Sequence, residues 1–124
     1  MIGEIRKALT PFYDSKAQRK SIKSRPVLIL AKADSSDFTV LPVSRVTKSE
    51  NIDPHYDVKV DPAEYPDLNL QYISYIRTHK QMTIHVAEIG DKIGDMKISY
   101  EDLYLEVLAR REEYSAEVTR QALD

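Results

Sequence analysis

The sequence predicts a mainly β fold, a small curled antiparallel sheet followed by one C-terminal helix. Three observations predict it. Short segments are rich in β-branched and aromatic residues, turn residues separate these segments, and a helical hydrophobic period appears only near the end of the chain. With 124 residues the chain is long enough for a single core, so we expect residues 1–124 to form one domain.

The first half of the chain is expected to contain a β-hairpin. Residues 27–31 form an apolar run typical of a buried strand, and Pro26 suits the first residue of that strand because it has no N–H to donate. Residues 32–37 are turn residues, and residues 38–43 are expected to form the second strand. Before this hairpin, residues 14–24 are polar and basic without a hydrophobic period, which predicts a long mobile loop.

The N-terminal segment before that loop fits either a strand or a helical turn. Further strands are expected at residues 57–60, where polar and apolar residues alternate, at the β-forming residues 72–76, and at residues 92–96. Residues 61–67 contain two prolines and are expected to form a turn.

The C-terminal helix is predicted at about residues 99–122. Ser99 can cap its N-terminus, with Asp102 three residues later in the manner of a capping box. Leu103, Val107, Tyr114 and Val118 then share one helical face.

The charge is uneven although the formal net charge is only −2. Between residues 5 and 25 the only acid is Asp14, whereas the C-terminal segment is acidic, so the whole-chain charge hides a basic region. The absence of cysteine excludes a disulfide scaffold, a thiol nucleophile and a cysteine-bound metal. The three scattered histidines have no metal-ligand pattern, so neither metal nor cofactor is expected. No apolar run is long enough to span a membrane and no secretory signal is recognisable, so a cytoplasmic location is expected.

Arg25 is the first candidate functional residue. It stands between a basic segment and the apolar strand, and an arginine fixed at the rim of a sheet is suited to phosphate binding. The alternative is a rim arginine paired with an acid such as Glu4. The basic residues before Arg25 would attract phosphates through a salt-dependent interaction; they are Lys16, Arg19, Lys20 and Lys23.

Four segments together resemble the MazF/PemK toxin family, in the order and rough spacing that the family shows. They are Arg25-Pro26-Val27-Leu28-Ile29-Leu30, Leu41-Pro42-Val43-Ser44, Ile76-Arg77-Thr78 and Asp91-Lys92-Ile93-Gly94. No single motif is decisive, but the ordered set is much more specific, and the resemblance covers most of residues 3–108. It implies an SH3-like small barrel and a symmetric homodimer. The implied function is a type II toxin that cuts single-stranded RNA at short sequences without a metal, neutralised by an antitoxin whose acidic, flexible tail covers the basic groove.

The resemblance also implies residue roles. Arg25 corresponds to the family's catalytic arginine, and Ser44 stands at the position of its catalytic threonine, with Thr47 as an alternative hydroxyl. Metal-free cleavage can use the 2′-hydroxyl of the RNA as the nucleophile, so the protein must move protons and stabilise charge on the phosphorane.

A second group of candidates follows the predicted strand at residues 72–76. Arg77, Thr78 and His79 are expected to contact RNA. Arg77 can bind the RNA backbone or fix the sheet through a carboxylate, and His79 can donate a proton. Single-stranded RNA is also bound by stacking, for which the candidate residues are Tyr13, Tyr56, Tyr72 and Tyr75.

Two other functions remain open. The same barrel could bind nucleic acid without cutting it, because fold does not fix function. A gyrase poison of the CcdB type is the other, although that family acts through C-terminal residues that usually include a tryptophan, which this chain lacks.

Overall fold

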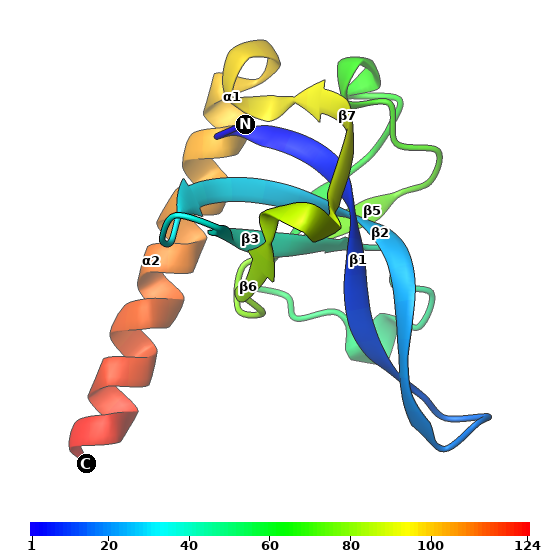
Figure 1. The fold of residues 1–124 in the computed structure, drawn as a ribbon. Helices are drawn as coiled ribbons and strands as arrows, with labels where there is room; N and C mark the ends of the chain where they lie inside the picture. The colour runs from blue at the N-terminus through cyan, green and yellow to red at the C-terminus, as the bar shows by residue number, and fades with distance from the viewer.

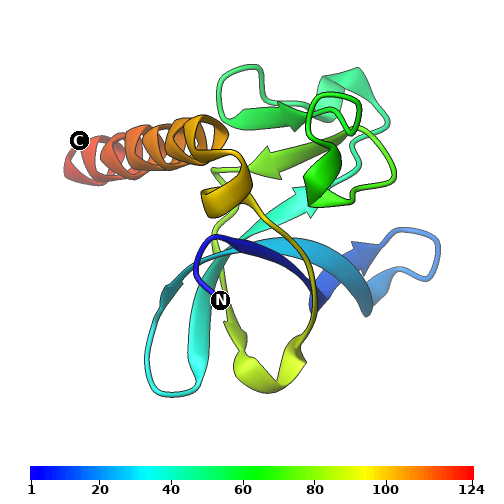
Figure 2. The ribbon, with the colours of Figure 1, turned by 90° about the horizontal axis from the view of Figure 1, so that it is seen from above.

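A computed structural model describes residues 1–124 and shows a seven-stranded, curled antiparallel sheet with a C-terminal helix against it (Figures 1 and 2). The strands are β1 (Glu4–Asp14), β2 (Arg19–Lys32), β3 (Asp37–Ser44), β4 (Asp57–Val60), β5 (Ser74–Arg77), β6 (Met82–His85) and β7 (Ile89–Asp95). The helices are α1 (Met96–Ser99) and α2 (Glu101–Leu123), and the 3-10 turns are η1 (Ser49–Asn51), η2 (Pro66–Leu68) and η3 (Val86–Glu88). The strand order is β4-β5-β3-β2-β1-β7, and β6 pairs with β3. The predicted fold class is confirmed.

The prediction of a long loop over residues 14–24 is wrong. β1 and β2 form a continuous hairpin from Ile5↔Leu28 to Asp14↔Arg19, closed by a short turn in which Asp14 Oδ1 accepts hydrogen bonds from the backbone N–H groups of Lys16 and Ala17 at 3.0 and 3.1 Å. The tip of this hairpin extends away from the rest of the sheet (Figure 1). Because both faces of such a ribbon contact solvent, its strands need no alternating apolar residues, and the hydrophobic pattern gives no signal.

Pro26 is not the first residue of its strand, since β2 begins seven residues earlier at Arg19. It pairs with Lys7 of β1 and precedes Val27, where β2 also begins to pair with β3 through Val27↔Pro42. Up to that point β2 has only one neighbouring strand, and a proline is tolerated on an edge because no second ladder is interrupted. The predicted hairpin between residues 27–31 and 38–43 is confirmed as the middle of β2 and β3.

The sheet buries apolar side chains on both faces. Val27, Leu28 and Ile29 are fully buried, and they alternate between two clusters. Leu28 belongs to the larger cluster, which α2 closes with Leu103, Tyr104 and Val107. The smaller cluster lies on the other face and consists of Ala8, Val27, Ile29, Phe38, Val40 and Ile84. Ile84 comes from β6, a four-residue strand that the sequence did not predict.

The remaining predicted strands exist, with shifted ends. β4 has the expected bounds, β5 begins two residues later than expected, and β7 begins three residues earlier. β5 lies between β3 and β4 in the sheet.

The helix is confirmed in extent but not in its cap. Ser99 ends the short α1, whose N-cap is Asp95, with Oδ1 accepting from Ile98 N–H at 3.0 Å; α2 follows at Glu101 without a side-chain cap. Of the predicted apolar face, Leu103 and Val107 are buried, Tyr114 is half-buried, and Val118 is exposed. Figure 2 shows the reason, since the second half of α2 extends beyond the sheet. Neither helix has the length and apolar composition that a membrane span requires.

Candidate nucleic-acid site

The candidate site lies where the pairing between β2 and β3 ends, before Val27 and after Pro42. A hollow of about 160 Å³ opens there, lined by residues of β1, β2, β3, β5 and β6 and by Lys80. We call it the Arg25 hollow; its lining residues are Thr10, Pro11, Arg25, Pro26, Pro42, Ser44, Arg77, Lys80 and Met82.

Strand register brings the functional side chains together. The pair Val27↔Pro42 places Arg25, two residues before Val27, alongside Ser44, two residues after Pro42. The pair Val43↔Ile76 in turn places Arg77 beside Pro42. Residues separated by more than thirty positions along the chain therefore line one hollow.

A second hollow of about 350 Å³ adjoins the first. It shares Arg25, Ser44, Arg77 and Lys80 and continues over the loop after β3, where Arg45 and Thr47 line it. We call it the Thr47 hollow. Arg25, Ser44, Thr47 and Arg77, all predicted site residues, thus lie around one continuous surface. Arg45 and Lys80 also lie there, and the sequence reasoning missed both, although each directly follows a segment already singled out.

Arg25 makes no ion pair within the protein. Its guanidinium lies over the Phe12 ring, 5.1 Å from the centroid, and the side chain is half-buried. Glu4, the alternative partner, instead pairs with Arg6 at 3.0 Å and Lys92 at 3.3 Å. The charge of Arg25 is therefore held in place by an aromatic ring and is available to an anion.

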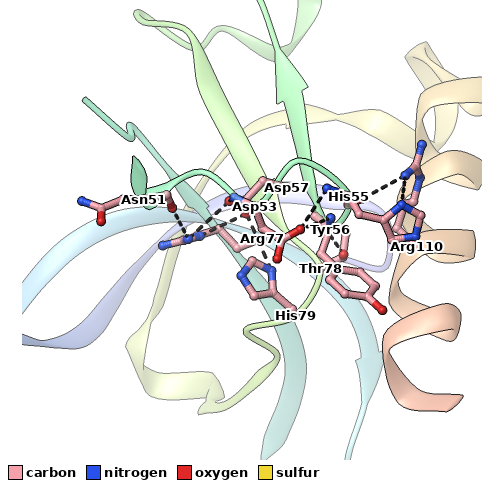
Figure 3. Close-up of polar contacts among 9 residues, drawn as sticks. All are labelled: Asn51, Asp53, His55, Tyr56, Asp57, Arg77, Thr78, His79 and Arg110. Atoms are coloured by element: carbon pink, nitrogen blue, oxygen red, sulfur yellow. Dashed lines mark hydrogen bonds and ion pairs between the residues drawn. The ribbon is translucent and has the colours of Figure 1, made fainter. Parts of the chain in front are cut away.

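Arg77 differs, because a buried carboxylate holds it (Figure 3). Its Nε lies 3.1 Å from Asp57 Oδ1, and its Nη2 donates to Asp57 Oδ2 at 3.3 Å and to the Asn51 carbonyl at 3.0 Å. Asp57 has no exposed side-chain surface and also accepts a hydrogen bond from Asp53 N–H at 2.8 Å. Of the two roles expected for Arg77, the structure shows the carboxylate contact, while the side chain still lines both hollows.

Thr78 and His79 lie outside both hollows. The Thr78 side chain is buried and its hydroxyl donates to the Tyr56 carbonyl at 2.6 Å, which is a structural hydrogen bond. His79 packs near the rings of Tyr56 and Tyr114, with its Nδ1 3.7 Å from Asp57 Oδ1. Loss of solvation lowers the pKa of His79, and the nearby Asp57 carboxylate opposes this only in part.

The basic residues of the hairpin are exposed and lie apart from the hollows. The regular register separates them into two faces. Ala8↔Arg25, Thr10↔Lys23 and Asp14↔Arg19 share one face of the ribbon, whereas Lys20 pairs with Tyr13 on the other. Lys16 belongs to the turn. Arg19 and Lys23 therefore extend the face that carries Arg25, a distinction that residue type alone does not show.

Comparison with known proteins places this geometry in a family. The chain matches the family of PemK-like, MazF-like toxins of type II toxin-antitoxin systems over residues 3–110. No curated protein shows significant similarity to the chain over its sequence.

Several solved structures share the fold. The Mycobacterium tuberculosis toxin MazF-mt6 has a TM-score of 0.60 and 23% identity, covering 89% of this chain and 96% of that toxin. An endoribonuclease in complex with its cognate antitoxin, from Mycobacterial species, has a TM-score of 0.63 and 12% identity, covering 94% of each chain. A crystal structure of an Mtb toxin has a TM-score of 0.57 and 19% identity, covering 85% of this chain and 99% of the other. The chain therefore belongs to the PemK-like, MazF-like toxin family of type II toxin-antitoxin systems.

Proposed function

We propose that this protein is an endoribonuclease that cuts single-stranded RNA at short sequences without a metal, as the toxin of a toxin-antitoxin pair. The observation that carries the proposal is the Arg25 guanidinium, which has no carboxylate partner and belongs to a hollow that Ser44, Arg77 and Lys80 also line. Membership of the toxin family supports the same reaction.

The proposed reaction is an internal transesterification. The 2′-oxygen forms a bond to the adjacent phosphorus and loses its proton, while the bond to the 5′-oxygen breaks and that oxygen takes up a proton. The products are a 2′,3′-cyclic phosphate and a 5′-hydroxyl end. Negative charge grows on the phosphorane oxygens, and a fixed guanidinium with a neighbouring hydroxyl can stabilise it more than it stabilises the ground state.

Ser44 is the proposed hydroxyl donor to a non-bridging oxygen, and Thr47 is the alternative. Ser44 lines both hollows with Arg25, whereas Thr47 lines only the second. Lys80, beside both, is a further cation that can stabilise the leaving oxygen.

Substrate and partner follow from the charges. Single-stranded RNA would run from the Arg25 hollow along the hairpin face that carries Lys23 and Arg19. The proposed antitoxin has an acidic, flexible tail that competes for these cations, and the proposed assembly is a cytoplasmic homodimer. The similar structure of an endoribonuclease bound to its cognate antitoxin supports such a partner.

The test is incubation of the purified protein with a long single-stranded RNA in EDTA, followed by mapping of the cut ends. We expect discrete cuts at a shared short sequence, with Arg25→Ala at least about 100-fold slower because a main transition-state donor is lost. Arg25→Lys should retain only part of the activity, since an ammonium cannot bind phosphate bidentately. Arg120→Ala, an exposed arginine near the end of α2, is the control. Full activity of Arg25→Ala would contradict the assignment.

The same experiment tests a second function, binding of RNA without cleavage. One observation favours it, because neither hollow is lined by a carboxylate or an imidazole that could accept the 2′-hydroxyl proton. RNA that stays intact but is retained by the protein, with weaker retention by Arg25→Ala, would establish this function in place of cleavage.

A further inference from the structure

A third and larger hollow, of about 640 Å³, adjoins the site. Pro26 lines both this hollow and the Arg25 hollow, and Arg45 lines both this hollow and the Thr47 hollow. We call it the Tyr72 hollow. Strand alternation places Pro26 on the opposite face of β2 from Arg25, so the hollows meet at the edge where the pairing of β2 with β3 has ended. An RNA strand that has one phosphate at Arg25 and passes over this edge would bring a nearby nucleotide to the third hollow.

The Tyr72 hollow contains a stacking platform. The Arg45 guanidinium carbon lies 4.0 Å from the centroid of the Tyr72 ring, and Tyr72 remains 53% exposed. Unstacked bases of single-stranded RNA are bound by aromatic rings and by guanidinium planes. An aromatic side chain left half in solvent while an arginine covers it offers both kinds of surface.

The platform is fixed before any ligand arrives. The Ser74 hydroxyl donates to the Tyr72 carbonyl at 2.9 Å, and the Asn69 side-chain amide donates to the Ile93 carbonyl of β7 at 2.8 Å. The turn before Asn69 also packs directly on Gly94, where an added Cβ would lie only 2.8 Å from the Leu68 Cα. The loop that carries Tyr72 is therefore docked on β7, and binding there costs little ordering of the protein.

Groups that can read a base edge line the same hollow. The Asn69 amide nitrogen is used by its bonds to backbone carbonyls, so its Oδ1 is left as an acceptor. The Gln71 amide makes no hydrogen bond within the protein and offers both donors and an acceptor. Sequence-specific recognition of single-stranded RNA uses this combination of stacking and edge hydrogen bonds.

We propose that the Tyr72 hollow binds a nucleobase next to the scissile phosphate and contributes to the choice of cut sequence. Arg45 and Tyr72 stack on the base, and Asn69 and Gln71 contact its edge. The inference rests on the proposed ribonuclease function and adds to it the residues that determine specificity.

The test compares cut-site profiles of wild type, Tyr72→Ala, Gln71→Ala and Tyr72→Phe on one long single-stranded RNA. In Tyr72→Ala we expect cleavage at the preferred sequence to fall about 10-fold or more, as for the loss of one base stack, while the preference at one position of that sequence relaxes. Gln71→Ala should relax the same position with a smaller loss of rate. Tyr72→Phe keeps the ring and should keep the profile. Lys59→Ala, an exposed residue of β4 outside the three hollows, is the surface control.

The two proposals fail in different ways. If wild type cuts RNA and Tyr72→Ala cuts at the same sequences with the same relative rates, the base site is wrong and the ribonuclease stands. If wild type cuts nothing, the ribonuclease fails, and binding of deoxyribonucleotide homopolymers tests the base site alone. If Tyr72→Ala then lost the preference of wild type for one base, this loss would support the base site, and an unchanged preference would overturn the base site. A retained thermal transition by circular dichroism excludes misfolding as the cause of a changed profile.

Discussion

Arg25 and Arg77 line the same hollow, but their surroundings give them different tasks. Arg77 is held by two contacts to the buried Asp57, so much of its charge is compensated within the protein. Arg25 lies over the Phe12 ring without an ion pair or a side-chain hydrogen bond, so its charge is available to a ligand. An arginine paired with a buried carboxylate serves the structure of the protein, whereas phosphate binding needs an arginine that is held in position but has no carboxylate partner.

Ser44 and Thr47 are separated by their places in the structure, and substitution should separate them in rate. Ser44 is the half-buried last residue of β3 beside Arg25, whereas Thr47 is exposed in the following loop. We expect Ser44→Ala to lower the single-turnover cleavage rate about 100-fold, on the order of one lost transition-state donor, and Thr47→Ala to lower it much less. The opposite order of rates would assign the role to Thr47.

His79 should make stability depend on pH. Loss of solvation lowers its pKa below the ordinary value of 6.5, so the folded protein holds the neutral imidazole while the unfolded chain takes up a proton more readily. The free energy of unfolding should therefore be undiminished above pH 6.5 and should fall as the pH drops from there toward the lowered pKa, by at most about 1.4 kcal/mol per pH unit.

Urea denaturation of wild type and His79→Gln between pH 7.5 and 5.5 measures this effect. Asp57, Arg77, Lys80 and Asp53 act on the imidazole and are present in both proteins, so the difference between the two curves reports His79. Parallel curves would show that the pKa of His79 is the same in the folded protein and in the unfolded chain.

The β1–β2 hairpin is the element in which position, rather than composition, decides function. The basic residues near its tip are Lys16, Arg19, Lys20 and Lys23. All four lie in solvent, but of these only Arg19 and Lys23 share the face that carries Arg25. The side chains of a two-stranded ribbon project from two opposite faces, and a bound strand of RNA can follow only one of these faces.

Two double variants with matched charge test this geometry. Arg19→Gln with Lys23→Gln, in an Arg25→Ala background that leaves RNA intact, should weaken RNA binding and reduce the slope of log affinity against log salt by about 1.4, which corresponds to two lost phosphate contacts. Lys16→Gln with Lys20→Gln removes the same charge and should change the slope much less. Equal slopes for the two variants would show that the hairpin acts by overall charge alone.

At the scale of the whole molecule, the core ends well before the chain does. Val107 is the last buried residue of α2, and later residues touch the body through a few contacts, which include Tyr114 with Tyr56 and Arg111 with Gln81. The family match also ends at residue 110. The sheet and the first two turns of α2 therefore contain the packing that defines the fold.

A chain ending at Arg110 should fold cooperatively, with a free energy of unfolding lowered by about 1–2 kcal/mol, chiefly through the lost aromatic contacts of Tyr114. It should also cut RNA at the sequences that the full chain cuts. Urea denaturation followed by circular dichroism measures the first expectation, and end mapping measures the second. A truncated chain that shows no cooperative transition would mean that the end of α2 is part of the folding unit.

The sequence by itself determined the fold class and the principal catalytic candidate. The apolar run at residues 27–31, the polar turn after it and the helical period after Ser99 are local patterns, and each corresponds to an element in the structure. The same local order of segments carried the resemblance that pointed to Arg25 and Ser44. Such features can be recognised because burial on one or both faces of an element leaves a period in the sequence.

The tertiary structure alone decided which side chains meet. The outer part of the β1–β2 ribbon is largely exposed and leaves no hydrophobic period, so residues 14–24 were expected to form a loop. The pairing of Arg77 with Asp57, the burial of Thr78 and the place of Arg45 and Lys80 beside Arg25 depend on strand register and on contacts between distant residues. A side chain's type sets the chemistry it can perform, but the partner or the open surface beside it is set by packing, which no local pattern encodes.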